Sequence, residues 1–313
     1  MRIAFFGTPQ FSAEILKKLL KIDDLDIALV VSQTDKPIGR KKIIMPTPVK
    51  EVALDNNIEV LQPTKLAGNT EFFDKLNSLD LDFIVVVAYG KIVPTGVLTA
   101  NKYGPINIHG SILPKYRGAS PVQECLLKGD KKTGLTIMFM DEKMDEGDIL
   151  AIKEVDIDIV DTQKEIFEKF VEIGPDLLVD TLKKVSTGEL KGQKQNYEEA
   201  TYCSMIKKQD GQIDFNLSSE EIYNKLRAYT PWPGIFTQYK GKKFAIEKAF
   251  FCENQPDNAE VGDVIKTVSG EIGIVCGKGV LTLKQVKVEG KKSQDIKSFL
   301  NGHKDFLDYN FNK

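Results

Sequence analysis

The chain has 313 residues, of which 42% are hydrophobic, and this is enough for two domains of ordinary size, each with its own core. Its formal net charge of −2 argues against a surface coated with basic residues for indiscriminate nucleic-acid binding, although a local basic patch is compatible with it. The four cysteines form no C-x-x-C pair, which argues against a disulfide framework or a thiolate zinc site and indicates a reducing compartment.

No stretch of about 18 apolar residues occurs in the chain, so no membrane span is expected. The first residues, MRIAFFGTPQF, contain one early arginine and then have the pattern of a strand and a turn. They lack the long apolar run of a signal peptide. We therefore expect a cytoplasmic protein.

The N-terminal residues predict a strand, a turn and a helix. The apolar run Arg2–Phe6 predicts a strand that ends at the turn Gly7-Thr8-Pro9. Ser12 is expected to cap a helix whose apolar face consists of Ile15, Leu16, Leu19 and Leu20. A second strand at Ile27–Val31 completes a strand–helix–strand unit, which predicts a parallel α/β sheet. The turn has only one glycine of the G-x-G-x-x-G pattern, so dinucleotide binding is not expected.

A long, basic loop follows from Ser32 to Pro48. Four cations fall within seven of its positions: Lys36, Arg40, Lys41 and Lys42. A loop of this length inside a compact α/β domain is usually functional or disordered. The charges alone are most simply explained by a solvated loop, but the apolar run Ile43–Met45 favours docking onto a partner.

The remaining patterns of the first domain continue the α/β alternation. Helices are expected at Val49–Asn56, at Thr70–Leu79 with a cap at Asn69 or Thr70, at Ala119–Lys128 and from about Thr162 to Val185. Further strands are expected at Glu59–Leu61, Phe83–Ala88, Thr133–Met140 and Ile149–Asp156. The run Phe83–Ala88 is uninterrupted and apolar, as in a central strand buried on both faces. Ligands of open α/β sheets bind beyond the carboxyl ends of such strands, here at Tyr89 and Gly90.

The stretch PINIHGSILPKYRGASPVQ, from Pro105 to Gln123, has the strongest functional pattern. Asn107 and His109 alternate on an extended strand, so their side chains point to the same side. The glycines and prolines that follow break regular structure, and we expect the backbone groups of Ser111–Pro114 to be free for a polar ligand. An isolated N-x-H is more often a buried pair that ends an ordinary strand.

A turn with five carboxylates in eight residues spans Asp141–Asp148. It could be a solvated turn or a calcium loop, but its spacing fails the D-x-[DN]-x-[DN]-G pattern with a distant Glu. From the residues alone, Asp141, Asp145 and Asp148 are equally plausible functional carboxylates.

A polar linker is expected at residues 189–206, between a first domain at 1–188 and a second at 207–313. In the second domain, Ser218 or Ser219 is expected to cap a helix that ends before TPWPG. Short β segments follow at Ile235–Tyr239, Phe244–Phe251, Val264–Val268, Ile272–Cys276 and Val280–Val288. This spacing predicts a small OB-like barrel. The second domain has a small excess of Lys and Arg over Asp and Glu, which suits contact with an RNA backbone.

The run NIHGSILPKYRGASP resembles the signature of the folate-dependent formyltransferases, and matching motifs occur in order from FGTP to PWPG over essentially the whole chain. The basic loop is similar to that of the methionyl-tRNA formyltransferase family. The resemblance implies a Rossmann-like catalytic domain and a tRNA-contacting barrel. It also implies transfer of the formyl group of 10-formyltetrahydrofolate to the α-amine of methionyl-initiator tRNA, for translation initiation.

The resemblance also assigns roles to residues. It implies catalytic roles for Asn107, His109 and Asp145, the last from the match of the acidic turn to M-D-x-x-x-D-x-G-D-I. The folate site that it implies consists of Val87, Ala88, Tyr89, Gly90, Ser111, Ile112, Leu113 and Pro114. The implied tRNA contacts are Lys36, Arg40, Lys41 and Lys42. Lys41 replaces a glycine of the family loop, so the backbone path there is expected to differ while the charge is kept.

These residue types suit acyl transfer. A tetrahedral oxyanion needs preorganised donors, which the amide of Asn107 and an imidazole N–H of His109 provide. Asp145, near His109, could accept the proton of the attacking amine and fix the imidazole tautomer. No metal and no nucleophilic side chain is needed. We expect a monomer.

Two other functions fit part of the pattern. A sugar-nucleotide N-formyltransferase would share N-x-H-x-S-x-L-P, but it has no use for a long basic loop. A folate- or RNA-binding protein without catalytic activity would not need Asn107, His109 and Asp145 together.

Overall fold

The computed structural model describes residues 1–38, 42–254 and 256–313, and the chain forms two compact units. The N-terminal unit consists of Met1–Pro121, Lys132–Asp156 and Phe167–Ser204. The C-terminal unit consists of Val122–Lys131, Ile157–Ile166 and Met205–Lys313. Two short segments from the first part of the chain, Val122–Lys131 and Ile157–Ile166, thus belong to the C-terminal unit. The domain boundaries expected from the sequence, 1–188 and 207–313, remain a prediction.

The N-terminal unit is built on one seven-stranded sheet in the order β10-β9-β7-β6-β1-β2-β5. The strands are β1 (Arg2–Gly7), β2 (Asp26–Val31), β5 (Val60–Leu61), β6 (Phe83–Val87), β7 (Pro105–His109), β9 (Lys132–Phe139) and β10 (Ile149–Asp156). From β5 to β7 all neighbours are parallel, and β9 and β10 add an antiparallel edge. The predicted open, mostly parallel sheet is confirmed.

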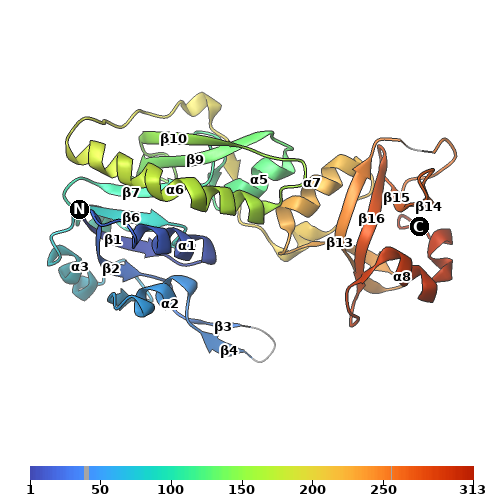
Figure 1. Ribbon diagram of the computed structural model, residues 1–313, viewed down its shortest axis with the longest axis horizontal. Coiled ribbons are helices and arrows are strands. Elements are labelled where there is room, and N and C mark those ends of the chain that lie inside the picture. Colours follow the sequence, from blue (N-terminus) through green and yellow to red (C-terminus); the bar gives the residue numbers. More distant parts are fainter. Residues whose placement is uncertain (39–41, 255) are drawn as a thin grey trace. The chain divides into compact units, whose positions relative to one another are not determined.

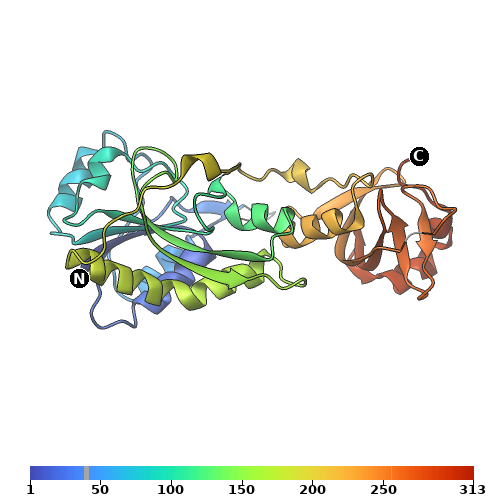
Figure 2. The same cartoon turned by 90° about the horizontal axis from the view of Figure 1, so that it is seen from above.

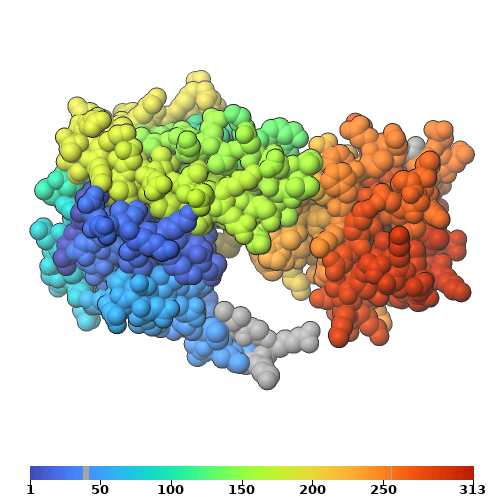
Figure 3. All heavy atoms as spheres, viewed as in Figure 1, coloured from blue at the N-terminus to red at the C-terminus, as the bar shows by residue number. Residues whose placement is uncertain are grey.

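Helices cover both faces of this sheet (Figures 1 and 2). On one face lie α1 (Gln10–Leu19) and α6 (Gln163–Ser186), side by side in the space-filling view (Figure 3). Gly174 of α6 approaches both Ile15 of α1 and Leu135 of β9. On the other face, α3 (Thr70–Asn77) and α4 (Thr95–Leu98) pack on alternate side chains of β1, β2 and β6. Burial on both faces explains why the central strands are continuously apolar.

Ser12 is not the helix cap that the sequence predicts. Pro9 has an extended backbone and is the N-cap, so α1 begins at Gln10, and Ser12 is fully buried inside the first turn. The Ser12 hydroxyl donates to the carbonyl of Val87 at 2.5 Å. This bond ties the start of α1 to the end of β6. By contrast, the predicted cap at Asn69 is confirmed, since its side chain accepts from Phe72 N.

The basic segment is not an irregular loop where it is described. β3 (Lys36–Ile38) and β4 (Ile43–Met45) pair antiparallel as a hairpin, and α2 (Pro48–Asp55) follows. The apolar side chains of β4 are exposed. Arg40 and Lys41 lie outside the described residues.

The C-terminal unit contains a curled antiparallel sheet in the order β12-β13-β16-β15-β14, with β17 on β16. Its strands are β12 (Ile235–Tyr239), β13 (Lys242–Cys252), β14 (Val264–Lys266), β15 (Ile272–Val275), β16 (Val280–Val288) and β17 (Gln294–Asp295). α7 (Ser219–Tyr229) packs on β13 and β16. Ser218 caps α7 in a capping box with Glu221. The predicted small β domain is confirmed as a half-barrel.

Short elements complete the chain. They are α5 (Pro121–Leu127), α8 (Ile296–Gly302), β8 (Arg117–Gly118), β11 (Tyr202–Cys203) and the 3-10 helices Tyr197–Glu199, Lys208–Gly211 and Lys304–Asp308. β8 and β11 pair in parallel, so a segment near residue 200 lies beside the stretch after β7. None of the helices in the described part of the chain is long and apolar enough to cross a membrane.

Aromatic rings fill the core of the C-terminal unit near α8. Phe306 is fully buried, and its ring centroid lies 5.0 Å from that of Phe299, 5.3 Å from Tyr239 and 5.6 Å from Phe244. Such pairs stabilise beyond the area that they bury. This cluster therefore holds α8 and the C-terminal 3-10 helix against the sheet.

We predict that Phe306→Ala lowers the free energy of unfolding of the C-terminal unit by about 3–5 kcal/mol, because it leaves a cavity among these rings. Trp232 is the only tryptophan of the chain and belongs to this unit, so its fluorescence in a urea titration measures the effect. Leu307→Ala is the control, since Leu307 is exposed and adjacent. Equal midpoints for the two variants would contradict this packing.

Candidate active site

Asn107 and His109 lie on β7, the strand at which the sheet changes from parallel to antiparallel pairing. β7 pairs in parallel with β6 and antiparallel with β9. His109 is the last residue of β7 and is buried, whereas Asn107 is half-buried. Among the described residues, no group forms a hydrogen bond with the Asn107 side chain. Its amide is therefore available to a ligand.

Each ring nitrogen of His109 faces a protein oxygen, and one of the two contacts is a hydrogen bond. Nε2 lies 3.0 Å from the carbonyl oxygen of Tyr116. Because a carbonyl only accepts, Nε2 must carry the hydrogen in this contact. Nδ1 lies 3.7 Å from Oδ1 of Asp145 and faces that carboxylate. The fold thus brings together two residues that are 36 positions apart in the sequence.

The structure separates the three carboxylates between which the residues alone did not choose. Asp141 is exposed and accepts from the backbone N–H of Lys143. Asp148 is half-buried and lies beside Gly192. Of the three, within the part of the chain that is described, only Asp145 faces His109, with 3.7 Å between its Oδ1 and the imidazole Nδ1.

Asp145 is held in an unusual backbone conformation. Its φ is 56°, in the left-handed region that residues with a Cβ seldom adopt. Its Oδ2 accepts from the backbone N–H of Gly118 at 2.8 Å. Two residues later, Gly147 packs so tightly that a Cβ would lie 1.9 Å from the carbonyl oxygen of Phe139. The acidic turn therefore folds back onto the end of β9, which directs Asp145 toward His109.

The prediction that the backbone groups of Ser111–Pro114 are free was wrong for most of them. Thr136 of β9 lies opposite His109, and its hydroxyl donates to Ser111 O at 2.6 Å and accepts from Leu113 N at 3.1 Å. Ile112 O accepts from Lys115 N, and Pro114 O accepts from Thr201 N. Two of these backbone groups thus bond to Thr136, a buried residue on the neighbouring strand, and the spacing of residues in the sequence does not reveal this partner.

The side chains of the same four residues divide into two pairs. Ser111 and Leu113 are buried, and the Ser111 hydroxyl donates to Lys115 O. Ile112 and Pro114 are half-buried. These two side chains are therefore the ones that a ligand can reach.

The residues after β6 alternate in the same way. Val87 and Tyr89 are buried, whereas Ala88 and Gly90 are exposed and have positive φ. The Tyr89 carbonyl accepts from Thr8 Oγ1 at 2.9 Å and from the Gln33 amide at 2.8 Å. A ligand at this strand end would meet Ala88 and Gly90.

The phenol of Tyr89 points away from this strand end. Its ring packs against Phe6 with 5.5 Å between centroids. Burial raises the pKa of Tyr89 to about 12, and its hydroxyl finds no hydrogen-bond partner among the described residues. We therefore assign this side chain to the core.

The basic hairpin keeps its charge exposed where it is described. Lys36 and Lys42 are exposed, and Lys36 Nζ donates to the Gln33 side chain at 2.9 Å. Lys42 adopts a φ of 49°. Arg40 and Lys41, also predicted to contact a polyanion, lie outside the described residues.

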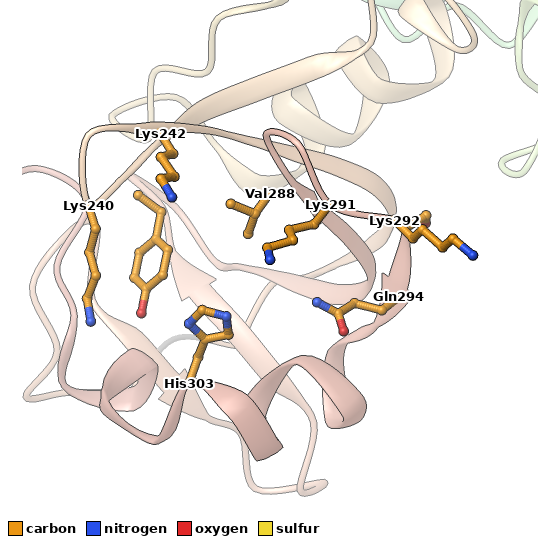
Figure 4. A pocket seen from close by; sticks show the side chains of 9 residues that line it. Lys240, Lys242, Val288, Lys291, Lys292, Gln294 and His303 are labelled. Carbon is orange, nitrogen blue, oxygen red and sulfur yellow. The ribbon is translucent and has the colours of Figure 1, made fainter.

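The C-terminal unit contains a lysine-rich groove of about 520 Å³, bordered by the β12–β13 turn, the β16–β17 turn and the end of α8 (Figure 4). Lys240 pairs with Asp305. No carboxylate partner is found in the described chain for Lys242, Lys291 or Lys292. His303 lines the groove, and its ring stacks on that of Phe299 with 4.2 Å between centroids. The groove is suited to an anion.

Within the described residues, no three His, Cys, Asp or Glu side chains are grouped as a metal site. None of the four cysteines forms a disulfide, and burial raises the pKa of the Cys276 thiol to about 12.

Two family models match the chain. The model described as Formyl transferase matches residues 1–182, and the model described as Formyl transferase, C-terminal domain, matches residues 205–304. The first contains the β7 site and the acidic turn. The second covers most of the half-barrel unit.

Relatives match over nearly the full length. A protein named Methionyl-tRNA formyltransferase from Caldicellulosiruptor saccharolyticus is 44% identical over 97% of this chain and 97% of its own. Proteins of the same name from Clostridium novyi and Caldanaerobacter subterraneus are each 41% identical, with the same coverage.

Solved structures share the fold at lower identity. An N-formyltransferase from Helicobacter canadensis, in complex with folinic acid and dTDP-3-aminofucose, has a TM-score of 0.65 at 19% identity, over 91% of this chain and 99% of its own. HypX from Aquifex aeolicus in complex with tetrahydrofolic acid has a TM-score of 0.62 at 16% identity, over 98% of this chain and 47% of its own.

We predict that Gly147→Ala destabilises the N-terminal unit by about 1–3 kcal/mol, because the added methyl group overlaps the Phe139 carbonyl. Thermal unfolding followed by circular dichroism measures the change. Gly96→Ala is the control in the same unit, since its methyl group would lie at an ordinary 3.7 Å from the Phe73 ring. A Gly147→Ala chain as stable as this control would contradict the folded-back turn.

Proposed function

We propose the function of this chain from one established premise: it belongs to the formyl transferase family. It is a transferase that moves the formyl group of 10-formyltetrahydrofolate to the α-amine of methionyl-initiator tRNA. The product, N-formylmethionyl-tRNA, serves translation initiation. The observation that carries this proposal is the 39–44% identity, over 97% of the chain, to proteins named Methionyl-tRNA formyltransferase.

Formyl transfer is an acyl transfer between two nitrogens. The α-amine attacks the formyl carbon, an oxyanion forms, and the bond from carbon to the folate nitrogen breaks. The uncommitted amide of Asn107 donates to the oxyanion, and such donors lower the barrier most when they are preorganised. The half-buried position of Asn107 on the rigid strand β7 supports this role.

We assign the second donor to His109. Its Nε2–H is engaged by the Tyr116 carbonyl, so the N–H that can reach a substrate is at Nδ1, on the side of Asp145. In the doubly protonated form the imidazole donates from both nitrogens. The carboxylate of Asp145, with its Oδ1 3.7 Å from Nδ1, stabilises the positive charge of this form.

Asp145 is also the proposed proton carrier. The attacking amine becomes positively charged as the new carbon–nitrogen bond forms, and it must lose a proton. Asp145 takes this proton directly or through water and returns it to the folate nitrogen as that group leaves. The proton count then balances, and no step requires a metal ion.

We place the folate donor between the end of β6 and the loop after β7. The accessible parts of the two predicted folate segments are Ala88 and Gly90 on one side, and Ile112 and Pro114 on the other. β6 and β7 are parallel neighbours, so their carboxyl ends adjoin. The buried members Val87, Tyr89, Ser111 and Leu113 support the site from behind.

We assign tRNA contacts to both units. The exposed hairpin residues Lys36 and Lys42, together with Arg40 and Lys41, supply positive charge in the N-terminal unit. The groove at Lys242, Lys291 and Lys292 supplies it in the C-terminal unit. Lysines without carboxylate partners can bind backbone phosphates and release counterions.

All proposed catalytic residues come from one unit of one chain, which supports a monomeric enzyme. The substrate is a component of translation. We accordingly infer a cytoplasmic location.

A sugar-nucleotide acceptor is the main alternative, because a sugar 3N-formyl transferase, WlaRD, shares the fold with a TM-score of 0.63 at 21% identity. The deciding experiment offers the enzyme 10-formyltetrahydrofolate with either methionyl-initiator tRNA or an amino-sugar nucleotide. Formylation of the tRNA alone is expected. Formylation of the sugar alone would refute the assigned acceptor and leave the chemistry of β7 intact.

We predict that Asn107→Ala, His109→Ala and Asp145→Asn each lower kcat by about 10²–10³-fold, because each removes a group that acts in the transition state. Initial rates of tRNA formylation measure this loss. Asp141→Asn, in the same acidic turn, is the control and should remain active. A folded variant with normal kcat would remove its residue from the mechanism.

We predict that replacing Lys242, Lys291 and Lys292 together by alanine raises KM for tRNA while kcat and KM for the folate stay unchanged. The slope of log KM for tRNA against log salt should also fall by about 2–3, one unit for each lost phosphate contact. The control removes three exposed lysines of the N-terminal unit: Lys21, Lys65 and Lys153. Equal effects in both triple variants would mean that only net charge matters.

A further inference from the structure

Arg117 is the largest fully buried side chain of the chain as described, and no role is predicted for it beyond its place in the motif. Its Nε and Nη2 both donate to Oε1 of Gln195, at 3.0 and 2.8 Å. Its Nη1 donates to the hydroxyl of Tyr202 at 3.2 Å and lies 3.5 Å from the Glu146 carboxylate. A buried guanidinium is tolerated only with such a full set of partners.

The side chain of Gln195 links Arg117 to the acidic turn. Its side-chain N–H₂ donates to the carbonyl of Asp145 at 2.9 Å and to that of Gly147 at 2.7 Å. Because Arg117 can only donate, the oxygen of the Gln195 amide must face it, and the N–H₂ must then face the turn. Gln195 is buried, so water does not compete for these bonds.

These contacts converge on Asp145. Asp145 has a positive φ, and such a conformation persists only where its surroundings fix it. Its backbone carbonyl is held by Gln195, and its carboxylate is held by the N–H of Gly118, which follows Arg117 in the chain. The carboxylate is thereby fixed from two directions beside His109.

Gln195 lies in the segment predicted to be a linker, and this segment is tied to the N-terminal sheet by backbone hydrogen bonds. Gln193 forms two of them with Ile149, at the start of β10, each of 2.8 Å. These bonds hold the chain next to the acidic turn at Gln193, two residues before Gln195.

We propose that Gln195, oriented by Arg117, is a positioning residue for formyl transfer that acts by fixing the backbone of Asp145. This inference rests on the proposed function, in which Asp145 carries the proton. It assigns a part in the reaction to Gln195, which lies far along the chain from β7. Gln195 itself touches neither substrate.

The test is Gln195→Glu, which keeps an acceptor for Arg117 but cannot donate to the two carbonyls. We expect kcat for tRNA formylation to fall by about 10- to 100-fold, since small misplacements of a reacting group have effects of this size. KM for the folate and for the tRNA should stay within about threefold. Gln193→Glu is the matched control, because its side chain is exposed, and it should behave as wild type.

Gln195→Asn is the second variant, because its shorter amide cannot reach both Arg117 and the turn, and it should also lose kcat. Circular dichroism and thermal unfolding establish that each variant is folded at the assay temperature. Normal kcat in either folded variant, or a loss that appears only as a raised KM, would overturn this inference. Failure of the wild-type chain to formylate methionyl-tRNA would instead refute the proposed function.

Discussion

The constraint on which the proposed active site depends is the placement of one carboxylate by irregular backbone. Asn107 and His109 are fixed by the hydrogen bonds of β7 to its two neighbours, but Asp145 lies in a turn that no sheet holds. Its position beside His109 relies on Gly147 against the Phe139 carbonyl, on the Gly118 N–H and on Gln195. Each of these contacts is specific and depends on a different residue, so each can fail by itself.

The sheet provides the frame for this arrangement. β7 lies between a parallel and an antiparallel neighbour, so the carboxyl end of β6 and the residue Thr136 of β9 both adjoin the loop that follows His109. The Thr136 hydroxyl forms hydrogen bonds with two backbone groups of that loop, so few polar groups of the loop are left without a partner. A folate site there would present mainly apolar surface from Ile112 and Pro114, with polar recognition left to other groups.

The fold was largely predictable from the sequence, because the patterns that determine it are local. The buried run Phe83–Val87, the alternation of Asn107 and His109, and the cap at Asn69 depend on neighbours within a few residues. Ser12 was misassigned because its hydroxyl serves the end of β6, 75 positions away in the sequence. Composition and spacing contain no signal for such a partner.

The same reasoning explains what was missed at the site. Asp145 could be chosen over Asp141 and Asp148 only through a family resemblance, because its distinguishing feature is a contact with a strand 36 positions earlier. Gln195 had no signal at all: a polar residue in a polar segment resembles a linker until the buried guanidinium of Arg117 is found beside it. Long-range polar networks are thus the part of this protein that a sequence pattern does not reveal.

The most direct test of this account is a double-mutant cycle between Asp145 and Gln195, measured as the single-turnover rate of formyl transfer to methionyl-tRNA. If Gln195 acts through Asp145, Gln195→Glu should slow the wild-type enzyme but have almost no further effect in an Asp145→Asn background. Two effects that multiply in the double variant would contradict the account, because Gln195 would then act independently of the carboxylate that it is proposed to hold.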